Sequence, residues 1–403
     1  MSKTVSQIIV ILSVLLVGCQ SPSKPTLSFV AENIEFAQAQ EKLQVDAIEK
    51  SGKILNPRTV ADGKVKYISP EDWTSGFYPG TMWYMYEITG DSTWRTYARK
   101  YTQAIDSVKY LTWHHDVGFM IQCSFGNGLR LGEQAYKDVI IQAAKSLSTR
   151  FHPVAGITQS WNVDKGWQSQ RGWECPVIID NMMNLELLFN ATRLSGDSTF
   201  YKIAVSHADQ TMKNHYRPDY SCYHVVDYSL KDGSVRNRHT AQGYAHESSW
   251  ARGQAWGIYG FTVCYRETHN PKYLEQAQKA FEFVVHNKNF PADFIPYWDF
   301  DAPKIPNEPR DASAAAIMAS ALYELSTYGN GVYYKGWADK IMTSLASPVY
   351  RAKVGENGNF LLMHSVGSIP HNQEIDVPLN YADYYFLEAL LRKSQLEKGN
   401  KLN

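Results

Sequence analysis

The chain has 403 residues and a mass of 45.8 kDa, enough for two or three average domains or for one large domain. Its 40 Lys and Arg residues balance 40 Asp and Glu residues, so the net charge of zero argues against a nucleic-acid-binding protein. Hydrophobic residues make up 44% and charged residues 20%, which excludes an intrinsically disordered chain. Aromatic residues make up 13%, and their flat rings suit both core packing and sugar binding.

An apolar run at residues 8–17 follows Lys3 and is too short to span a bilayer, which needs about 20 residues. The run ends in Leu-Val-Gly and Cys19, which resembles the lipid-attachment motif of bacterial lipoproteins. We therefore expect residues 1–18 to be a signal peptide, Cys19 to be lipidated, and residues 19–30 to form a flexible tether. The chain would be an exported lipoprotein of the cell envelope that meets the membrane only through its lipid. An ordinary secretory signal or a short anchor helix are the alternatives.

Four further cysteines follow, with no Cys-x-x-Cys pair and no histidine spacing of the zinc-binding type, so we expect no metal site. Export permits disulfides, but a large body does not need them. Whether these cysteines pair stays open at this point: Cys123, Cys175, Cys222 and Cys264.

Apolar residues recur at helical spacing, as in residues 181–189, and long strand-like alternation is scarce. Residues 90–94 (Gly-Asp-Ser-Thr-Trp) recur as residues 196–200 (Gly-Asp-Ser-Thr-Phe) and, more loosely, as residues 269–273 (His-Asn-Pro-Lys-Tyr). In each copy we expect Gly or Asn to end one helix in a left-handed cap and Asp, Ser or Pro to start the next. The pattern predicts about twelve helices in hairpins. Residues 31–403 should form a single all-α domain, an (α/α)6 toroid, with an open α-solenoid as the alternative.

Long polar and aromatic stretches separate the predicted helices. Loops of such length in a compact domain are usually functional. In a toroid they would gather at one rim and wall a cleft. The stretches are residues 118–132, 151–175, 217–249 and 290–311.

Two aspartates lie in unusual surroundings. Asp116 follows two histidines and precedes a Gly-Phe turn, and Asp180 follows three apolar residues at the start of a helical pattern. Asp180 could be a plain N-cap. An acid among apolar residues loses hydration, however, and its pKa rises, as a general acid at neutral pH requires. The sequence therefore marks both aspartates as candidate catalytic groups.

Aromatic and basic residues form a second group of candidates. Arg252 and Trp256 lie four residues apart, which on a helix places a guanidinium beside an indole that could hold a carboxylate and stack on a ring. A surface cation–π pair is the alternative. Trp73, in residues 72–77, is either a sugar platform or a core residue.

Six segments together resemble the unsaturated glucuronyl hydrolases of glycoside hydrolase family 88, in order over nearly the whole mature chain. They are residues 72–77, 115–119, 179–184, 250–256, 311–315 and 380–384. The resemblance implies the (α/α)6 fold, no metal and no cofactor. It also implies removal of a 4,5-unsaturated uronic acid from the non-reducing end of oligosaccharides that a polysaccharide lyase has generated. The reaction is hydration of the C4=C5 double bond.

The resemblance also assigns roles by position. Asp180 matches the general acid/base and Asp116 the second essential aspartate. Gln242 matches the partner of the C2-side hydroxyl. The other substrate-binding matches are Trp73, His224, Arg252 and Trp256.

Some members of this family carry Ser-x-x-Ser-x-Lys, which contacts a sulfate group of the substrate. Here Ser365 and Ser368 are present, but Pro370 replaces the lysine, which puts the sulfate position in doubt. Arg236 or Arg238 could offer a cation instead. Substrates derived from glycosaminoglycans and from the algal polysaccharide ulvan both stay open.

Three rival functions are compatible with parts of this pattern. An unsaturated rhamnogalacturonyl hydrolase of family 105 would share the fold and the reaction, but Gln242 favours family 88. An inverting hydrolase of saturated glycosides would use an acid and a base about 6.5–9.5 Å apart. A non-catalytic, lipid-anchored sugar-binding protein would keep the aromatic platform and tolerate loss of Asp180.

Overall fold

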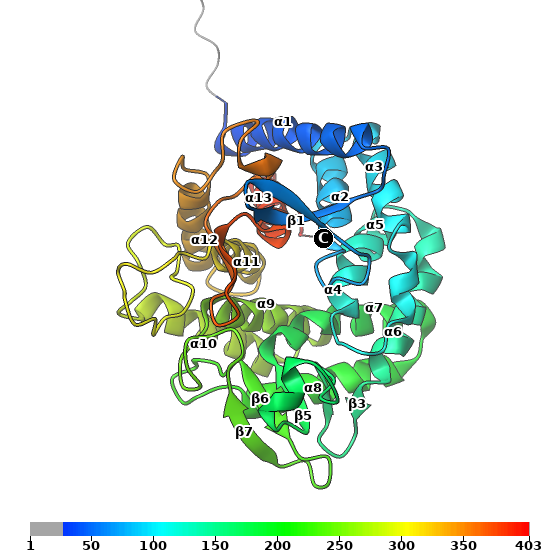
Figure 1. The fold of residues 1–403 in the computed structure, drawn as a ribbon, viewed down its shortest axis with the longest axis vertical. Coiled ribbons are helices and arrows are strands. Elements are labelled where there is room, and N and C mark those ends of the chain that lie inside the picture. Colours follow the sequence, from blue (N-terminus) through cyan, green and yellow to red (C-terminus); the bar gives the residue numbers. More distant parts are fainter. Residues whose placement is uncertain (1–26, 403) are drawn as a thin grey trace, which may run out of the picture.

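The computed structural model describes residues 27–402, and these form a ring of helices (Figure 1). The predicted signal peptide, Cys19 and most of the predicted tether lie outside the described residues. The first helix, α1 (Phe29–Lys50), begins two residues before residue 31, the predicted start of the catalytic domain. Ser28 sets this start, because its hydroxyl accepts a hydrogen bond from the backbone N–H of Ala31 (3.2 Å).

Inner and outer helices alternate along the chain. Each outer helix packs against the outside of the ring: α1, α3 (Ser92–Gln103), α6 (Lys137–Ser148), α8 (Ser198–Asn214), α10 (Pro271–His286) and α12 (Gly331–Leu345). The inner ring consists of α2 (Phe77–Thr89), α4 (Val117–Ile121) with α5 (Asn127–Arg130), α7 (Leu185–Ser195), α9 (Ala251–Thr268), α11 (Ala312–Leu325) and α13 (Asn380–Glu397). The last inner helix, α13, packs against both α11 and α2, which closes the ring. The (α/α)6 toroid is therefore confirmed, and the open solenoid is wrong.

The repeated turn ends inner helices in its first two copies as predicted. Gly90 and Gly196 have φ angles of 72° and 77°, in the left-handed region that glycine adopts without strain. The aspartate that follows each glycine caps the next outer helix. Asp91 accepts the N–H of Thr93 and Asp197 that of Thr199, both at 2.8 Å.

The third copy differs from the prediction by one residue. His269, and not Asn270, adopts the left-handed conformation, with a φ of 54°. Asn270 instead caps α10 by accepting the N–H of Lys272 (3.2 Å). An N-cap must be extended, and Pro271 also disfavours a helical residue before it, so the chain reverses one residue earlier.

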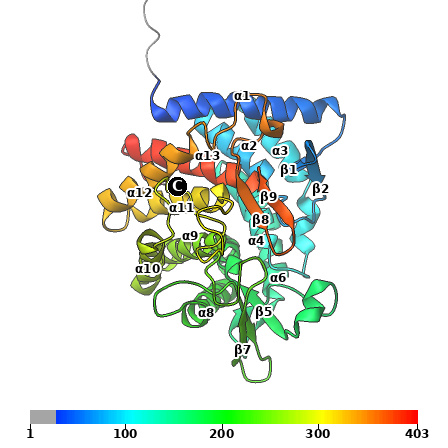
Figure 2. The same cartoon turned by 60° about the vertical axis from the view of Figure 1, so that its left-hand side comes forward.

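The two ends of the ring differ in their connections. Short turns lead from inner to outer helices, whereas the long connections from outer to inner helices carry every strand of the described residues. These strands form antiparallel hairpins or a small sheet: β1 (Asn56–Ala61) with β2 (Lys64–Ile68), β3 (Phe151–His152) with β4 (Ile157–Thr158), β5 (Cys175–Ile178) with β6 (Val225–Tyr228) and β7 (Val235–His239), and β8 (Ser365–Ser368) with β9 (Gln373–Val377). In Figure 2 the β8–β9 hairpin lies beside β1, and the two elements contact each other. The predicted gathering of long loops at one rim is confirmed for three of the four stretches.

The fourth stretch, residues 118–132, is not a loop but most of an inner helix, in which a π-helical turn (Gln122–Gly126) joins α4 to α5. Its polar and aromatic residues suggested a loop, but its glycines serve close packing. A Cβ on Gly118 would lie 2.4 Å from the side chain of Asn184, and one on Gly128 would lie 2.5 Å from Tyr136. Glycine at these positions lets neighbouring elements pack closely against this helix. The composition of the segment did not predict the helix.

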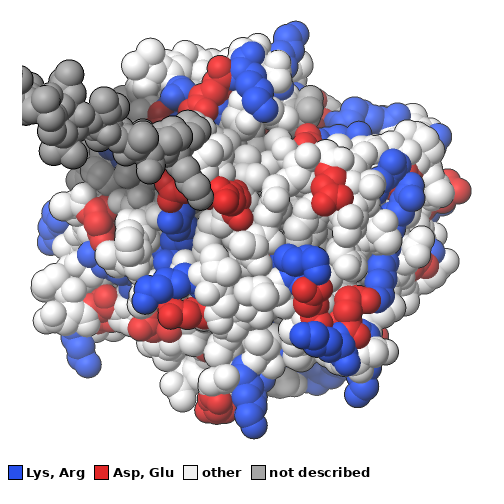
Figure 3. All heavy atoms as spheres, turned by 90° about the horizontal axis from the view of Figure 1, so that it is seen from above, with Lys and Arg blue, Asp and Glu red and all other residues white. Residues whose placement is uncertain are grey.

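The four cysteines after the N-terminus are buried free thiols, so they form no disulfide with one another. No helix within residues 27–402 is long and apolar enough to cross a membrane. Basic and acidic side chains alternate over the face shown in Figure 3, without a large region of one sign. This surface agrees with the balanced charge of the sequence.

Candidate active site

A cavity of about 280 Å³ opens at the rim where the inner helices begin. It brings together six of the nine residues predicted for catalysis and substrate binding: Asp116, Asp180, Trp73, Gln242, Arg252 and Ser368. Predicted residues His224, Trp256 and Ser365 are buried and do not line it. The sequence therefore located the pocket but overstated how many residues reach it.

Asp180 lies in a 3₁₀ helix (Ile179–Asn184) that follows β5 and leads into α7. The N-cap alternative is wrong, because Ile178 occupies the cap position and Oδ2 of Asp180 has no hydrogen-bond partner in the described chain. The residue is 6% exposed. Burial raises its pKa to about 7, although the nearby charge of Arg252 acts in the opposite direction. Asp180 can therefore hold a proton at neutral pH and release it to a bound substrate.

His224 is oriented toward Asp180 by backbone hydrogen bonds. Its Nδ1 accepts the N–H of Ala241 (3.0 Å) and of Gln242 (3.1 Å). Burial lowers the pKa of His224 well below its usual value, so the ring is neutral and its one hydrogen lies on Nε2. Nε2 is 3.7 Å from Oδ2 of Asp180. The histidine thus presents an N–H to the acid from behind the pocket wall.

Asp116 experiences the opposite environment. Burial would raise its pKa, but the neighbouring His115 and His114 outweigh burial and lower it. Oδ1 lies 3.3 Å from Nε2 of His115, and Oδ2 lies 3.2 Å from Nδ1 of His114. The ionised Asp116 in turn contributes to the raised pKa of Asp180. Two carboxyl groups with pKa values displaced in opposite directions are the arrangement that acid catalysis requires.

Arg252 is fully buried, which excludes a surface cation–π pair. The predicted neighbour was wrong, because the guanidinium packs over the ring of Trp250, with its carbon 4.3 Å from the ring centroid. Trp250 immediately precedes α9 and is extended, so its indole folds back over the first turn. The guanidinium also pairs with Asp311 (3.1 Å) and donates to the carbonyls of Val366 and Gly367.

Trp256 lies beneath the site and is no stacking platform. Its ring packs against Phe119 and Tyr385, with centroids 5.1 and 5.5 Å apart. Its buried indole N–H has no hydrogen-bond partner in the described chain. Trp73 combines both predicted alternatives, since it lines the cavity while its ring packs against Phe119 at 5.5 Å.

A clamp holds the β8–β9 hairpin against the pocket. Arg58, in β1, donates through Nε and Nη2 to both oxygens of Glu374 in β9, at 2.5 and 2.8 Å. Its Nη1 donates to Asp72 (2.6 Å). Glu374 packs on Gly367, where a Cβ would lie 2.5 Å from its Oε2. The carbonyl of Gly367 accepts hydrogen bonds from Arg252 (2.7 Å) and Gln242 (3.4 Å), so the clamp positions two pocket side chains.

Residues 56–395 match the family model described as Glycosyl Hydrolase Family 88. This chain belongs to that family. It is 45% identical to an unsaturated glucuronyl hydrolase of Formosa agariphila over 98% of this chain and 99% of the relative. A solved unsaturated glucuronyl hydrolase specific for heparin superposes with a TM-score of 0.87 at 44% identity, over 92% of this chain and 98% of that one. A mutant enzyme of Streptococcus agalactiae, solved with dGlcA-GalNAc6S, has a TM-score of 0.76 at 28% identity, over 90% and 91%.

The family match decides among three of the predicted functions. The chain is a glycoside hydrolase of family 88, and neither family 105 nor a non-catalytic binding protein is favoured.

The predicted substitute cations do not reach the pocket of this family 88 enzyme. Arg236 pairs with Asp227 (2.7 Å) outside it, and Arg238 packs over Tyr223 and donates to the carbonyl of Asn214 (3.0 Å). Ser365 is also absent from the lining, whereas Ser368 lies 2.7 Å from His371 through Oγ and Nδ1.

Several lining residues of this family 88 enzyme were not predicted individually. Trp161 and Trp167 come from residues 151–175, which were marked as a functional loop, and Tyr381 comes from the segment 380–384 that carried the resemblance. Arg58 and His371 had no local signal, because only the packing of β1 against the β8–β9 hairpin brings them to the cavity.

Proposed function

We propose that this enzyme is an unsaturated glucuronyl hydrolase, which removes a 4,5-unsaturated uronic acid from the non-reducing end of lyase-generated oligosaccharides. The observation that carries the proposal is the pair of carboxyl groups, Asp180 with a raised pKa and Asp116 with a lowered one, in one pocket of a family 88 chain. Relatives at 45% and 44% identity bear the same activity in their names.

In the proposed reaction, protonated Asp180 gives its proton to C4 of the C4=C5 double bond. Positive charge then develops at C5 and the ring oxygen, where the ionised Asp116 stabilises it. Water adds at C5 and returns a proton to Asp180. The resulting hemiketal opens, which releases the leaving sugar and a 4-deoxy-5-keto uronate. The reaction needs one well-placed proton donor and no attack on the anomeric carbon.

The substrate carboxylate has favourable surroundings in this pocket. The inner helices begin at this rim, so the positive ends of their dipoles face the cavity. Arg58 and Arg252 lie in the same wall. Trp73 and Trp161 offer aromatic surfaces for the flat unsaturated ring, and Gln242 is placed to contact its C2-side hydroxyl. The parent polysaccharide is a glycosaminoglycan or ulvan.

We also propose that the enzyme is exported as a lipoprotein through residues 1–18 and Cys19, and that a polysaccharide lyase acts before it. The apolar run and the cysteine that follows it support this proposal. Replacing Cys19 with Ser should move the protein from the membrane fraction to the soluble fraction of the producing cell. Retention of Cys19→Ser in the membrane fraction would contradict lipid attachment.

The activity is tested by following the ultraviolet absorbance of the conjugated double bond. The substrates are lyase-generated disaccharides of chondroitin, heparin, hyaluronan and ulvan, with unsaturated rhamnogalacturonan disaccharide and a saturated glycoside alongside. Decay that Asp180→Asn abolishes establishes the hydration reaction and identifies the substrate class. Decay with only the rhamnogalacturonan product, or release of sugar from only the saturated glycoside, would overturn the proposal.

A further inference from the structure

Beside the catalytic cavity lies a second hollow, which is lined by residues 240, 241 and 243–246 together with Arg171 and Pro370. The two hollows share Ala241, and both are lined by residues from the same two segments, 240–246 and 367–371. If a sugar ring occupies the catalytic cavity, the next sugar of the same oligosaccharide can lie in or beside the second hollow.

Arg171 is held in a fixed position at this hollow. It ends a 3₁₀ helix (Trp167–Arg171), and its guanidinium carbon lies 4.8 Å from the ring centroid of Trp173 and 6.0 Å from that of Trp167. Its Nη2 donates to the carbonyl of Thr240 (2.5 Å), the one hydrogen bond that its side chain makes within residues 27–402. A guanidinium has five N–H donors, so most of them stay available to a ligand.

The other cations near the substrate are already paired. Arg58 binds two carboxylates and Arg252 binds one. Arg171 has no ion pair with any carboxylate of the described chain. Burial lowers its pKa. Burial, followed by the charge of Arg171, lowers the pKa of His371, so this neighbouring ring is neutral at neutral pH. Among residues 27–402, Arg171 is therefore a positive charge beside the pocket without an acidic partner.

We propose that Arg171 binds an oxyanion on the leaving sugar, either a sulfate ester or a carboxylate, and so determines substrate specificity. The inference rests on the proposed function, because that reaction defines which sugar leaves. The planar guanidinium matches the two oxygens of such a group. Trp167 lines the catalytic cavity and also contacts Arg171, so a sugar on this indole would bring its substituent to the guanidinium.

The test compares unsaturated disaccharides of identical sugars that differ by one sulfate on the leaving sugar, and a third with a uronate as leaving sugar. Arg171→Gln should lower kcat/KM for the anionic substrates about tenfold and for the neutral one less than about twofold. Arg171→Lys should recover part of the loss. Arg238→Gln is the matched control, because Arg238 also packs over an aromatic ring but lines neither hollow. Loss with only the sulfated or only the carboxylated substrate identifies the anion.

A direct binding measurement separates this inference from the proposed reaction. Chemical-shift titration of N-acetylglucosamine 6-sulfate against N-acetylglucosamine needs no turnover. Preference for the sulfated sugar in the wild type, lost in Arg171→Gln, supports the inference even if no disaccharide is hydrolysed. Hydrolysis with equal effects of Arg171→Gln on neutral and anionic substrates overturns the role of Arg171 and leaves the proposed function intact. No preference in the titration, with no hydrolysis, overturns both.

Discussion

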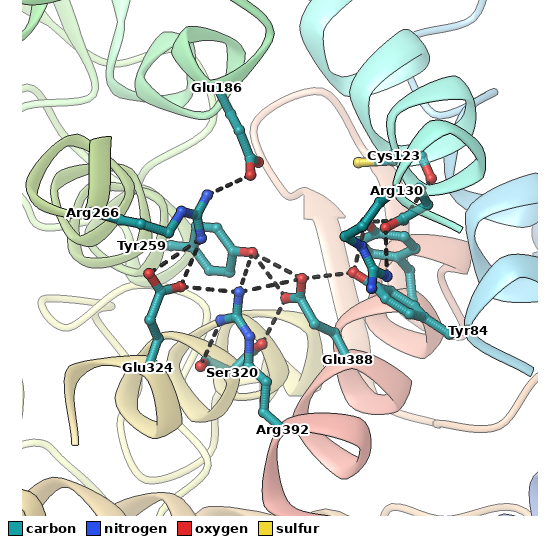
Figure 4. A network of polar contacts seen from close by, with 12 residues as sticks. Tyr84, Cys123, Arg130, Glu186, Tyr259, Arg266, Ser320, Glu324, Glu388 and Arg392 are labelled. Carbon is teal, nitrogen blue, oxygen red and sulfur yellow. Dashed lines mark hydrogen bonds and ion pairs between the residues drawn. The ribbon is translucent and has the colours of Figure 1, made fainter. Parts of the chain in front are cut away.

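Charged side chains are buried at both ends of the helical ring, but the two ends differ in how many of their buried polar groups have partners. Where the inner helices end, a cavity of about 380 Å³ is surrounded by a closed network (Figure 4). Glu388 accepts hydrogen bonds from Tyr84 (2.6 Å), Tyr259 (2.9 Å) and Ser320 (2.6 Å), and Arg392 lies 3.5 Å from it. Where the inner helices begin, buried polar atoms lack partners in the described chain, among them atoms of Asp180, His224, Trp256 and Tyr381.

The difference follows from the direction of the inner helices. Their carboxyl ends carry partial negative charge, which favours arginines there, and four of them line that cavity: Arg130, Arg193, Arg266 and Arg392. Each pairs with a glutamate, so this end stabilises the ring. The amino ends carry partial positive charge, and the polar atoms without partners there are available to an anionic substrate. The polar network at the carboxyl ends of the inner helices is therefore complete without a ligand, and we call this the complete end. The amino ends, where polar atoms lack partners, are the incomplete end.

Replacing the acid at the incomplete end should have the largest effect. Asp180→Asn removes the proton donor, so kcat should fall about 10³-fold, within the range for general acid catalysis. The variant should be more stable than the wild type at pH 8, by about 1–2 kcal/mol, because the raised pKa means that folding opposes ionisation of Asp180. This gain should be nearly lost at pH 4, where the acid is protonated in the folded state and about half protonated in the unfolded state. Single-turnover kinetics and thermal unfolding at both pH values measure the effects, and substantial activity in the pure variant would contradict the assignment.

Replacing an acid at the complete end should do the reverse. Glu388→Gln leaves Arg392 and three hydroxyl groups with a weaker acceptor, and loss of one member of a buried ion pair costs about 3–5 kcal/mol. The midpoint of chemical denaturation should fall, while kcat of the folded enzyme stays within about twofold of wild type. A large loss of kcat without a loss of stability would show that the two ends are not separate in function.

The pH dependence tests the acid itself. Since Asp180 must be protonated and has a pKa of about 7, kcat/KM should fall above pH 7 and approach about a tenfold loss per pH unit. Asp116→Asn provides the comparison, because its charge raises the pKa of Asp180. Asp116→Asn should be less active, and its kcat/KM should begin to fall at a pH about one unit lower than that of the wild type. If the pH at which kcat/KM falls were the same in Asp116→Asn and the wild type, or if kcat/KM rose through pH 7, Asp180 would not be the proton donor beside an ionised Asp116.

The sequence predicted local features of this enzyme well and spatial neighbours less well. Helix caps such as Asp91 depend on adjacent residues, so they could be foreseen. The segment around Asp180 was recognised because the apolar residues before it are contiguous. By contrast, Arg252 was assigned the wrong indole, because the extended Trp250 cannot be placed from helical spacing. Arg171 was missed entirely, since only the folded chain shows which arginines lack an acidic partner.

The clamp between β1 and the β8–β9 hairpin connects stability to chemistry at the incomplete end, and it should give the smallest effect. Glu374→Gln keeps the shape of the side chain but weakens its two hydrogen bonds to Arg58, so the hairpin should hold Gly367 less firmly. Because the Gly367 carbonyl positions Arg252 and Gln242, substrate binding should suffer more than the proton transfer from Asp180. We expect KM to rise about fivefold with kcat changed less than about twofold.

Asp376→Asn is the matched control for the clamp. Asp376 lies on the same strand and pairs with His364 through Nδ1 (2.6 Å), but both side chains are exposed and neither lines the pocket. Exposed pairs contribute little, so KM should stay within about twofold of wild type. Equal changes in the two variants would mean that general loosening of the hairpin, and not the contact of Glu374 with Gly367, sets the position of Arg252. A rise in KM for Glu374→Gln alone would show that an ion pair outside the reacting groups holds the pocket ready for its substrate.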